Sequence, residues 1–144
     1  MSATMSRNAE TVATFLRLLE ERNIDDWMEL WADEGTQYYP FGTEMFPRHL
    51  VGKAAIYDRW KGMPSMFDRL GFPIRETWEA GDTVIARFDS ECVLTGGRKY
   101  RNNYLGIFKF DADGKLREYW EYFDPIIAGV EFGIAAVAYA PARA

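Results

Sequence analysis

The sequence has one cysteine, one histidine, no excess of positive charge and no long hydrophobic run, and each absence excludes a class of protein. Cys92 cannot form an internal disulfide, and with His49 as the only imidazole the chain cannot build a site rich in cysteine or histidine. Any metal site would have to consist mostly of carboxylates, and we expect no metal. The net charge of −5 argues against a nucleic-acid partner, because phosphates favour a basic surface.

No apolar stretch reaches the length of a membrane span, and the letters MSATMSRNAE contain no basic segment followed by an apolar one. The sequence therefore predicts neither a membrane partner nor a signal peptide, and it favours a cytoplasmic location. Hydrophobic residues make up 48% of the 144 residues and aromatic ones 16%, which is typical of a globular chain. This length predicts a single domain spanning residues 1–144.

Apolar periodicity changes half-way along the chain. Helical spacing in the first half predicts helices over 6–23, 24–34 and 52–63, around a short strand over 35–42 and a loop over 43–51. Alternation in the second half predicts strands over 73–81, 83–94, 98–110 and 115–123, joined by glycine turns into an antiparallel meander. The apolar tail over 126–140 predicts a weak helix on the sheet or in a subunit interface. Helices followed by a curved antiparallel sheet indicate an α+β fold whose conical cavity suits an apolar small molecule.

The stretch ARFDSE, residues 86–91, carries a row of charges on one face of a strand. Side chains alternate along a strand, so Arg87, Asp89 and Glu91 share one face. That face either meets water or lines a pocket where the charges react. The predicted strands mix polar and aromatic residues on both faces, which favours a pocket on one side and a homodimer contact on the other.

The order of these segments resembles a known superfamily. Two helices, then LWADEGTQYYP, then GKAAI, then a meander ending in GKLREYWEYFDP, resemble the cone-shaped α+β roll of the nuclear-transport-factor-2-like superfamily over nearly the whole chain. Its members include ketosteroid isomerases, SnoaL-type polyketide cyclases, PhzA/PhzB proteins and limonene-1,2-epoxide hydrolases. The resemblance to ketosteroid isomerases fails at their reacting groups, because the base falls on Tyr39 and the two oxyanion donors fall on Phe15 and Gly106.

The motifs are more similar to those of limonene-1,2-epoxide hydrolases. The segments ARFDS, GGRKYRNNYLGIF and WEYFDP resemble the strands that carry the catalytic Arg-x-Asp and second carboxylate of that family, which fall on Arg87, Asp89 and Glu121. The resemblance implies cofactor-free epoxide opening, with Glu121 as the base, Asp89 as the acid and Arg87 between them. Gln37 and Tyr39 would help to hold the water.

Two alternatives stay open. PhzA/PhzB-like and SnoaL-like proteins place one acidic residue at Glu121, which implies an isomerase or cyclase that uses Glu121 alone; the PhzA/PhzB histidine falls on Arg59. A non-catalytic ligand-binding module is the third reading. Asn102 and Tyr104 either face the ligand or satisfy buried polar groups. The expected substrate-binding residues are Gln37, Tyr39, Phe41, Trp60, Met63, Asn102, Tyr104, Phe108, Tyr119 and Phe123.

Overall fold

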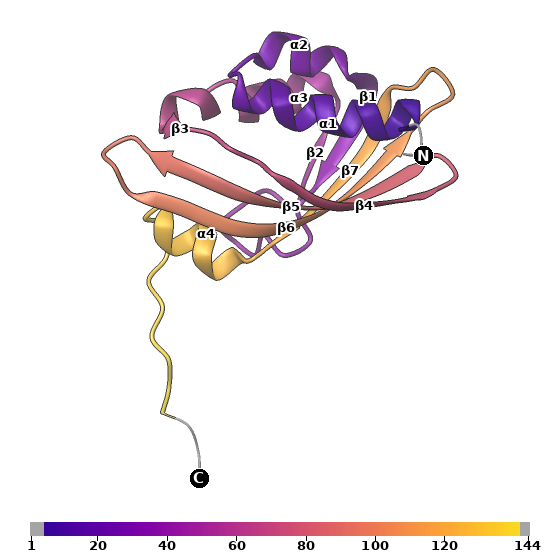
Figure 1. The fold of residues 1–144 in the computed structure, drawn as a ribbon. Helices are drawn as coiled ribbons and strands as arrows, with labels where there is room; N and C mark the ends of the chain where they lie inside the picture. The colour runs from indigo at the N-terminus through magenta and orange to yellow at the C-terminus, as the bar shows by residue number, and fades with distance from the viewer. Residues whose placement is uncertain (1–4, 142–144) are drawn as a thin grey trace.

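Two helices begin the chain and pack together over one side of the sheet. The computed structural model describes residues 5–141. Helix α1 (Arg7–Glu20) begins after Ser6, whose hydroxyl accepts a hydrogen bond from the Ala9 amide, and α2 (Ile24–Glu29) begins after Asn23 in the same way. Helix α3 (Lys53–Trp60) lies beside them, as Figure 1 shows. Within residues 5–141, no helix has the length and hydropathy that crossing a membrane requires.

Seven strands form one curved sheet. They are β1 (Trp31–Tyr38), β2 (His49–Val51), β3 (Phe67–Arg69), β4 (Ile74–Ala80), β5 (Thr83–Leu94), β6 (Lys99–Phe110) and β7 (Leu116–Phe123). A 3₁₀ turn, η1 (Met63–Met66), precedes β3, and α4 (Pro125–Glu131) follows β7. The strand order is β2-β1-β7-β6-β5-β3, and β4 also pairs with β5. The predicted α+β class and the meander of four strands, β4 to β7, are confirmed.

The sheet is mixed, where the sequence predicted an antiparallel one. β1 runs parallel to β7, with Gln37 opposite Tyr119. The second predicted helix also ends early, because the chain leaves α2 at Glu29 and Trp31 already lies in β1. Trp27 and Trp31 have helical spacing and are both buried, so their spacing alone could not tell a helix from a helix followed by a strand. The predicted loop over 43–51 contains β2, a strand of three residues.

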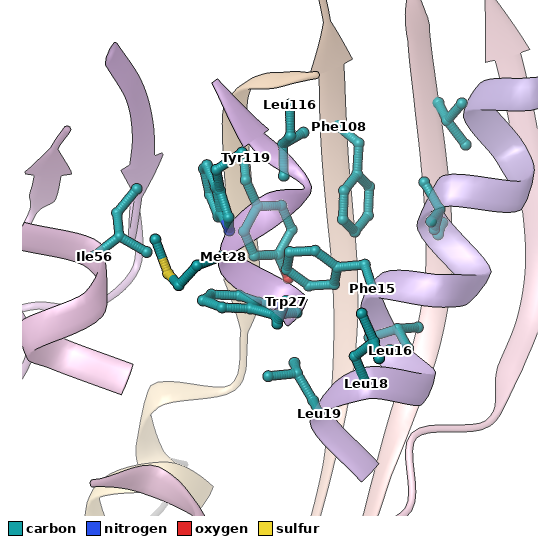
Figure 2. Close-up of a cluster of buried hydrophobic side chains, with 14 of the residues drawn as sticks. Phe15, Leu16, Leu18, Leu19, Trp27, Met28, Ile56, Phe108, Leu116 and Tyr119 are labelled. Atoms are coloured by element: carbon teal, nitrogen blue, oxygen red, sulfur yellow. The ribbon is translucent and has the colours of Figure 1, made fainter. Parts of the chain in front are cut away.

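An aromatic cluster joins the helices to the sheet. The ring of Phe15 lies 5.0 Å from that of Trp27 and 5.1 Å from those of Phe108 and Tyr119, measured between ring centroids. Figure 2 shows Phe15 of α1 reaching between these side chains. Burial of such rings removes a large apolar area from water and stabilises the fold. The tilted contacts between the rings add a smaller stabilisation that depends on their orientation. This cluster packs α1 against β6 and β7.

Alternation along the long strands separates an inner face from an outer one. Val84, Ala86, Phe88, Ser90 and Cys92 of β5 are buried, and the residues between them are more exposed. Residues directly opposite each other on neighbouring strands share a face. Ala86 lies opposite Gly106, and Gly106 lies opposite Glu121, so Gly106 and Glu121 also lie on the inner face. The site is built on this inner face.

Helix α4 packs against β6. Asp124 begins α4, and its carboxylate accepts hydrogen bonds from the amides of Ile126 and Ile127. The predicted helix over 126–140 is therefore confirmed only for its first part. Beyond Gly133 the described chain has no regular structure and leads away from the body (Figure 1).

Candidate active site

A cavity of about 360 Å³ lies between the inner face of the sheet and the surrounding helices. Its walls are mostly apolar and aromatic. They come from α1, the loop between β1 and β2, α3, η1, β3, β5, β6, β7 and α4, with shorter contributions from the segments after β3 and α4. Phe15 and Phe88 contribute rings from opposite sides, and Phe132 closes the end beside α4. This size and character are those of a site for a small, largely apolar molecule.

Glu121 brings a carboxyl group into this apolar cavity. The residue is 8% exposed, and its Oε1 accepts a hydrogen bond of 3.0 Å from the hydroxyl of Tyr119. Burial raises the pKa of Glu121 to about 7, although the Tyr119 hydrogen bond and the positive charge of Arg59 both act to lower the pKa. Among the described residues, Glu121 is the only carboxylic acid that lines the cavity. A carboxyl group with a pKa close to neutral can both accept and return a proton.

The cavity wall on the side of α3 includes Tyr39, Arg59 and Trp60. Tyr39 is 5% exposed, and burial together with the charge of Glu121 raises the pKa of Tyr39, so the phenol stays neutral. Arg59 and Trp60 lie on the same wall, and the guanidinium of Arg59 lies 5.8 Å from the ring centroid of Phe46. The indole nitrogen of Trp60 donates a 2.7 Å hydrogen bond to Oε1 of Gln37, which ties α3 to β1.

A second polar group lies on β6. The hydroxyls of Tyr100 and Tyr104 are 2.6 Å apart, and both residues line the cavity. Burial raises the pKa of Tyr100 to about 12 and raises that of Tyr104, so both phenols are neutral near pH 7. The cavity therefore contains one titratable acid near neutrality and a pair of neutral hydroxyls.

Many of the predicted site residues do line the cavity. They are Tyr39, Trp60, Met63, Tyr104, Tyr119, Glu121 and Phe123. Four others lie elsewhere. Gln37 is fully buried behind Trp60, Phe108 belongs to the core around Phe15, and Phe41 is 55% exposed and packs on Tyr122. Asn102 is buried behind Tyr100, where its amide satisfies hydroxyl and backbone groups instead of facing a ligand.

The predicted group of Asp89, Arg87 and Glu121 does not form. Asp89 lies opposite Asn103 and Arg87 opposite Leu105, and these are outer-face positions, whereas Glu121 lies on the inner face. The carboxylate of Asp89 instead accepts hydrogen bonds from Arg75 at 2.8 Å and from Asn103 at 2.9 Å. These partners hold the pKa of Asp89 below its ordinary value, which is the opposite of what a general acid needs. Within residues 5–141, the cavity thus has no second carboxyl group of the kind that the epoxide mechanism requires.

The residues that sequence reasoning missed come mostly from helices and loops. Arg59 was noted only as a replacement for a histidine, and Phe15 only as a replacement for an oxyanion donor, yet both line the cavity. Tyr100 was not among the predicted substrate-binding residues. It lies on the same face of β6 as Tyr104, so strand alternation could have predicted both residues together. Among the described residues, no three side chains of histidine, cysteine, aspartate or glutamate gather closely enough to hold a metal ion.

The family model of the SnoaL-like domain matches residues 12–119. The chain belongs to the SnoaL-like family. The resemblance to the nuclear-transport-factor-2-like and SnoaL-like superfamily is thereby confirmed. A similar protein described as PhzA/B-like belongs to one of the groups that the sequence resembled. The SnoaL-like relatives found give no support to the closer likeness to limonene-1,2-epoxide hydrolases.

The relatives of this SnoaL-like protein align with it over most of its length. An uncharacterized protein, YesE of Bacillus subtilis, is 31% identical over 127 residues, which are 86% of each chain. An uncharacterized PhzA/B-like protein of Pseudomonas aeruginosa is 24% identical over 85% of this chain and 91% of its own. The crystal structure of a candidate isomerase from Bacillus subtilis superposes with a TM-score of 0.82 at 29% identity, over 90% of this chain and 94% of the other.

Proposed function

We propose that this SnoaL-like protein is an isomerase or cyclase that moves protons on an apolar small molecule, with Glu121 as its acid–base group and without a cofactor. The observation that carries the proposal is a single buried carboxyl group, with a pKa of about 7, inside an aromatic cavity. The likeness to a candidate isomerase at 29% identity supports the same class of reaction.

The chemistry needs one group that works in both directions. Ionised Glu121 accepts a proton from an acidic C–H bond, and the electron pair of that bond is delocalised into the neighbouring unsaturated group. The protonated carboxyl then returns the proton to a different carbon, which isomerises the molecule. Alternatively, the carbanion attacks a carbonyl carbon within the same molecule and closes a ring; the carbonyl π pair moves to oxygen, and the protonated carboxyl gives its proton to this alkoxide. The hydroxyl of Tyr119 donates to the carboxylate and orients it toward the cavity.

Exchange of carbon-bound protons with solvent tests this proposal without knowledge of the natural substrate. One- and two-ring β,γ-unsaturated ketones would be incubated in D₂O, and deuterium uptake and double-bond migration followed by NMR. We expect the wild type to catalyse exchange with some of these probes, and Glu121→Gln to reduce the rate by about 10²–10⁴-fold. Glu118→Gln is the matched control, because Glu118 lies on the same strand outside the cavity lining. If Glu121→Gln exchanges as fast as the wild type, Glu121 is not the acid–base group.

The predicted homodimer remains a prediction, and the outer face of the sheet supports it. A row of cross-strand neighbours on this face is apolar or aromatic and runs across five strands: Trp78, Ile85, Ile107, Trp120 and Tyr38. Trp78 is 45% exposed, and Trp120 stacks on Tyr38 with ring centroids 3.9 Å apart. We propose that a second copy of the chain covers this row, because an apolar band of this kind on a folded chain commonly marks an interface.

A further inference from the structure

The amide of Asn102 fixes the hydrogen-bond direction in the group around Tyr100. Its Oδ1 accepts from the backbone amides of Asn103 at 2.8 Å and Asp124 at 3.2 Å, so this atom is the oxygen. Its Nδ2 donates to the carbonyl oxygen of Asp124 at 3.0 Å and to the hydroxyl of Tyr100 at 2.9 Å. Backbone groups on both sides of the amide exclude the reverse orientation, so the Tyr100 oxygen is an acceptor.

A count of hydrogens then leaves one without a protein acceptor. Tyr100 and Tyr104 each carry one hydroxyl hydrogen, and the single 2.6 Å contact between them uses one of the two. The remaining hydrogen belongs to Tyr104 if Tyr100 donates, and to Tyr100 if Tyr104 donates. Neither hydroxyl has any other acceptor among the hydrogen bonds of the described residues, and both side chains line the cavity. In either arrangement the pair offers one O–H group to a molecule in the cavity.

The position of this donor relative to Glu121 is set by the sheet. Tyr104 lies opposite Phe123, two residues along β7 from Glu121, so Tyr104 and Glu121 are diagonal neighbours on the inner face. Diagonal neighbours of this kind lie about 7–8 Å apart, with their Cβ atoms somewhat closer, and long side chains span this distance. The Tyr104 ring is also held in place, because it stacks on Phe88 at 5.0 Å with an angle of 5° between the planes.

We propose that the Tyr100–Tyr104 pair binds the carbonyl oxygen of the substrate, and that the substrate class is a cyclic or aryl ketone whose acidic C–H bond points toward Glu121. This inference rests on the proposed function and names its substrate class. As Glu121 removes the proton, the C–H electron pair forms a C=C bond and the carbonyl π pair moves to oxygen. The O–H group then donates to the enolate oxygen that forms. When the proton returns to carbon, the carbonyl group is restored and the two tyrosines are unchanged.

A matched pair of probes tests the donor separately from the proton transfer. 2-Acetylnaphthalene and 2-isopropenylnaphthalene have nearly the same shape, but only the ketone can accept a hydrogen bond. We expect the wild type to bind the ketone about 3- to 10-fold more tightly than the alkene. The double variant Tyr100→Phe/Tyr104→Phe should lose this preference while it keeps its affinity for the alkene, and alkene binding shows that the cavity is intact. Tyr57→Phe, an exposed residue of α3 outside the cavity lining, is the control.

The infrared carbonyl stretch of the bound ketone gives a second readout. A hydrogen bond lowers this frequency, so the band should lie lower in the wild type than in the double variant. Glu121→Gln should keep both the ketone preference and the lowered band while losing proton exchange, so failure of the two proposals can be told apart. If the double variant retains the preference and the band position of the wild type, the tyrosine pair does not bind the carbonyl oxygen and this inference is wrong.

Discussion

Gly106 lies directly opposite Glu121 across the β6–β7 ladder, and its missing side chain leaves room for the rings beside the carboxyl group. A Cβ atom at Gly106 would lie 2.7 Å from Cε2 of Phe108 and 3.0 Å from Cε1 of Tyr119. Tyr119 is the hydrogen-bond donor to Glu121, so the space at Gly106 also sets the geometry of the reacting group.

Gly106→Ala should therefore destabilise the fold by about 1–3 kcal/mol, because both aromatic rings must shift to admit one methyl group. Urea unfolding monitored by fluorescence measures this change in the free energy of unfolding. Gly62→Ala is the control, since Gly62 has a right-handed helical conformation and a Cβ atom there meets nothing within 4 Å. Equal midpoints for Gly106→Ala and the wild type would contradict the packing described around Tyr119.

Activity should rise with pH through about 7, because the reaction begins with ionised Glu121 and its pKa lies there. Tyr119→Phe removes a hydrogen bond that stabilises the ionised form, so the pKa of Glu121 should rise and the profile of kcat/KM should move to higher pH. Tyr122→Phe, on the outer face of the same strand, should leave the profile in place. A profile for Tyr119→Phe that moves to lower pH, or does not move, would contradict this assignment.

The free energy of unfolding should change with pH because folding raises the pKa of Glu121. Burial raises the pKa of Glu121 from its ordinary 4.5 to about 7, so between these values the folded chain binds more protons than the unfolded chain. The contribution of Glu121 to stability is therefore most favourable below pH 4.5 and falls as pH rises to about 7. Between pH 4.5 and pH 7 the free energy of unfolding of Glu121→Gln should gain about 3 kcal/mol relative to the wild type. Thermal unfolding of both proteins across this range measures the difference, and a constant difference would show that folding does not raise the pKa of Glu121.

Asp89→Asn should leave proton exchange and ring closure unchanged, because Asp89 lies on the face opposite the cavity. The change removes a partly exposed ion pair with Arg75, and such pairs contribute about 0–1 kcal/mol to stability. The rate measurement used for Glu121→Gln applies here too. Loss of activity in Asp89→Asn, with the fold intact, would restore a role for this strand in catalysis and count against Glu121 acting alone.

The apolar row on the outer face should determine the oligomeric state. Ile107→Lys places a charge in the middle of this row and should convert the proposed homodimer to monomers, as measured by analytical ultracentrifugation. Glu44→Lys, at an exposed loop position, gives the same substituent away from the sheet. A wild-type chain that sediments as a monomer at high micromolar concentration would exclude the homodimer.

The fold could be predicted well because the sequence patterns that indicate strands and turns are strong in the second half of the chain. The glycine turns and the alternation in the second half defined the meander, and the resemblance covered nearly the whole chain. Pairing of β1 with β7 could not be predicted from local pattern, because the two strands are far apart in sequence and parallel pairing leaves no turn between them.

The candidate site was predicted in part, and the error has a physical cause. Glu121 was placed correctly, but Asp89 and Arg87 were assigned to the same face, and a shift of one residue in register moves every side chain to the other face. The turn explains the error. A two-residue loop at Gly96 and Gly97 would pair Gly106 with Arg87, whereas the observed connection has three residues, 95–97, and pairs Gly106 with Ala86. Arg59 and Phe15 lie on helices, whose orientation over the sheet no strand pattern reveals.

The direct passage from β7 into α4 has a consequence for how relatives of this protein could diverge. The reactive carboxyl group lies near the end of β7, and the part of the cavity wall that contains Ala128 and Phe132 begins only a few residues later, after the cap at Asp124. Substitutions confined to this short terminal stretch would reshape the chamber while the proton-transferring group kept its setting. New ligand preferences could thus arise at the chain's end, without rebuilding the strands.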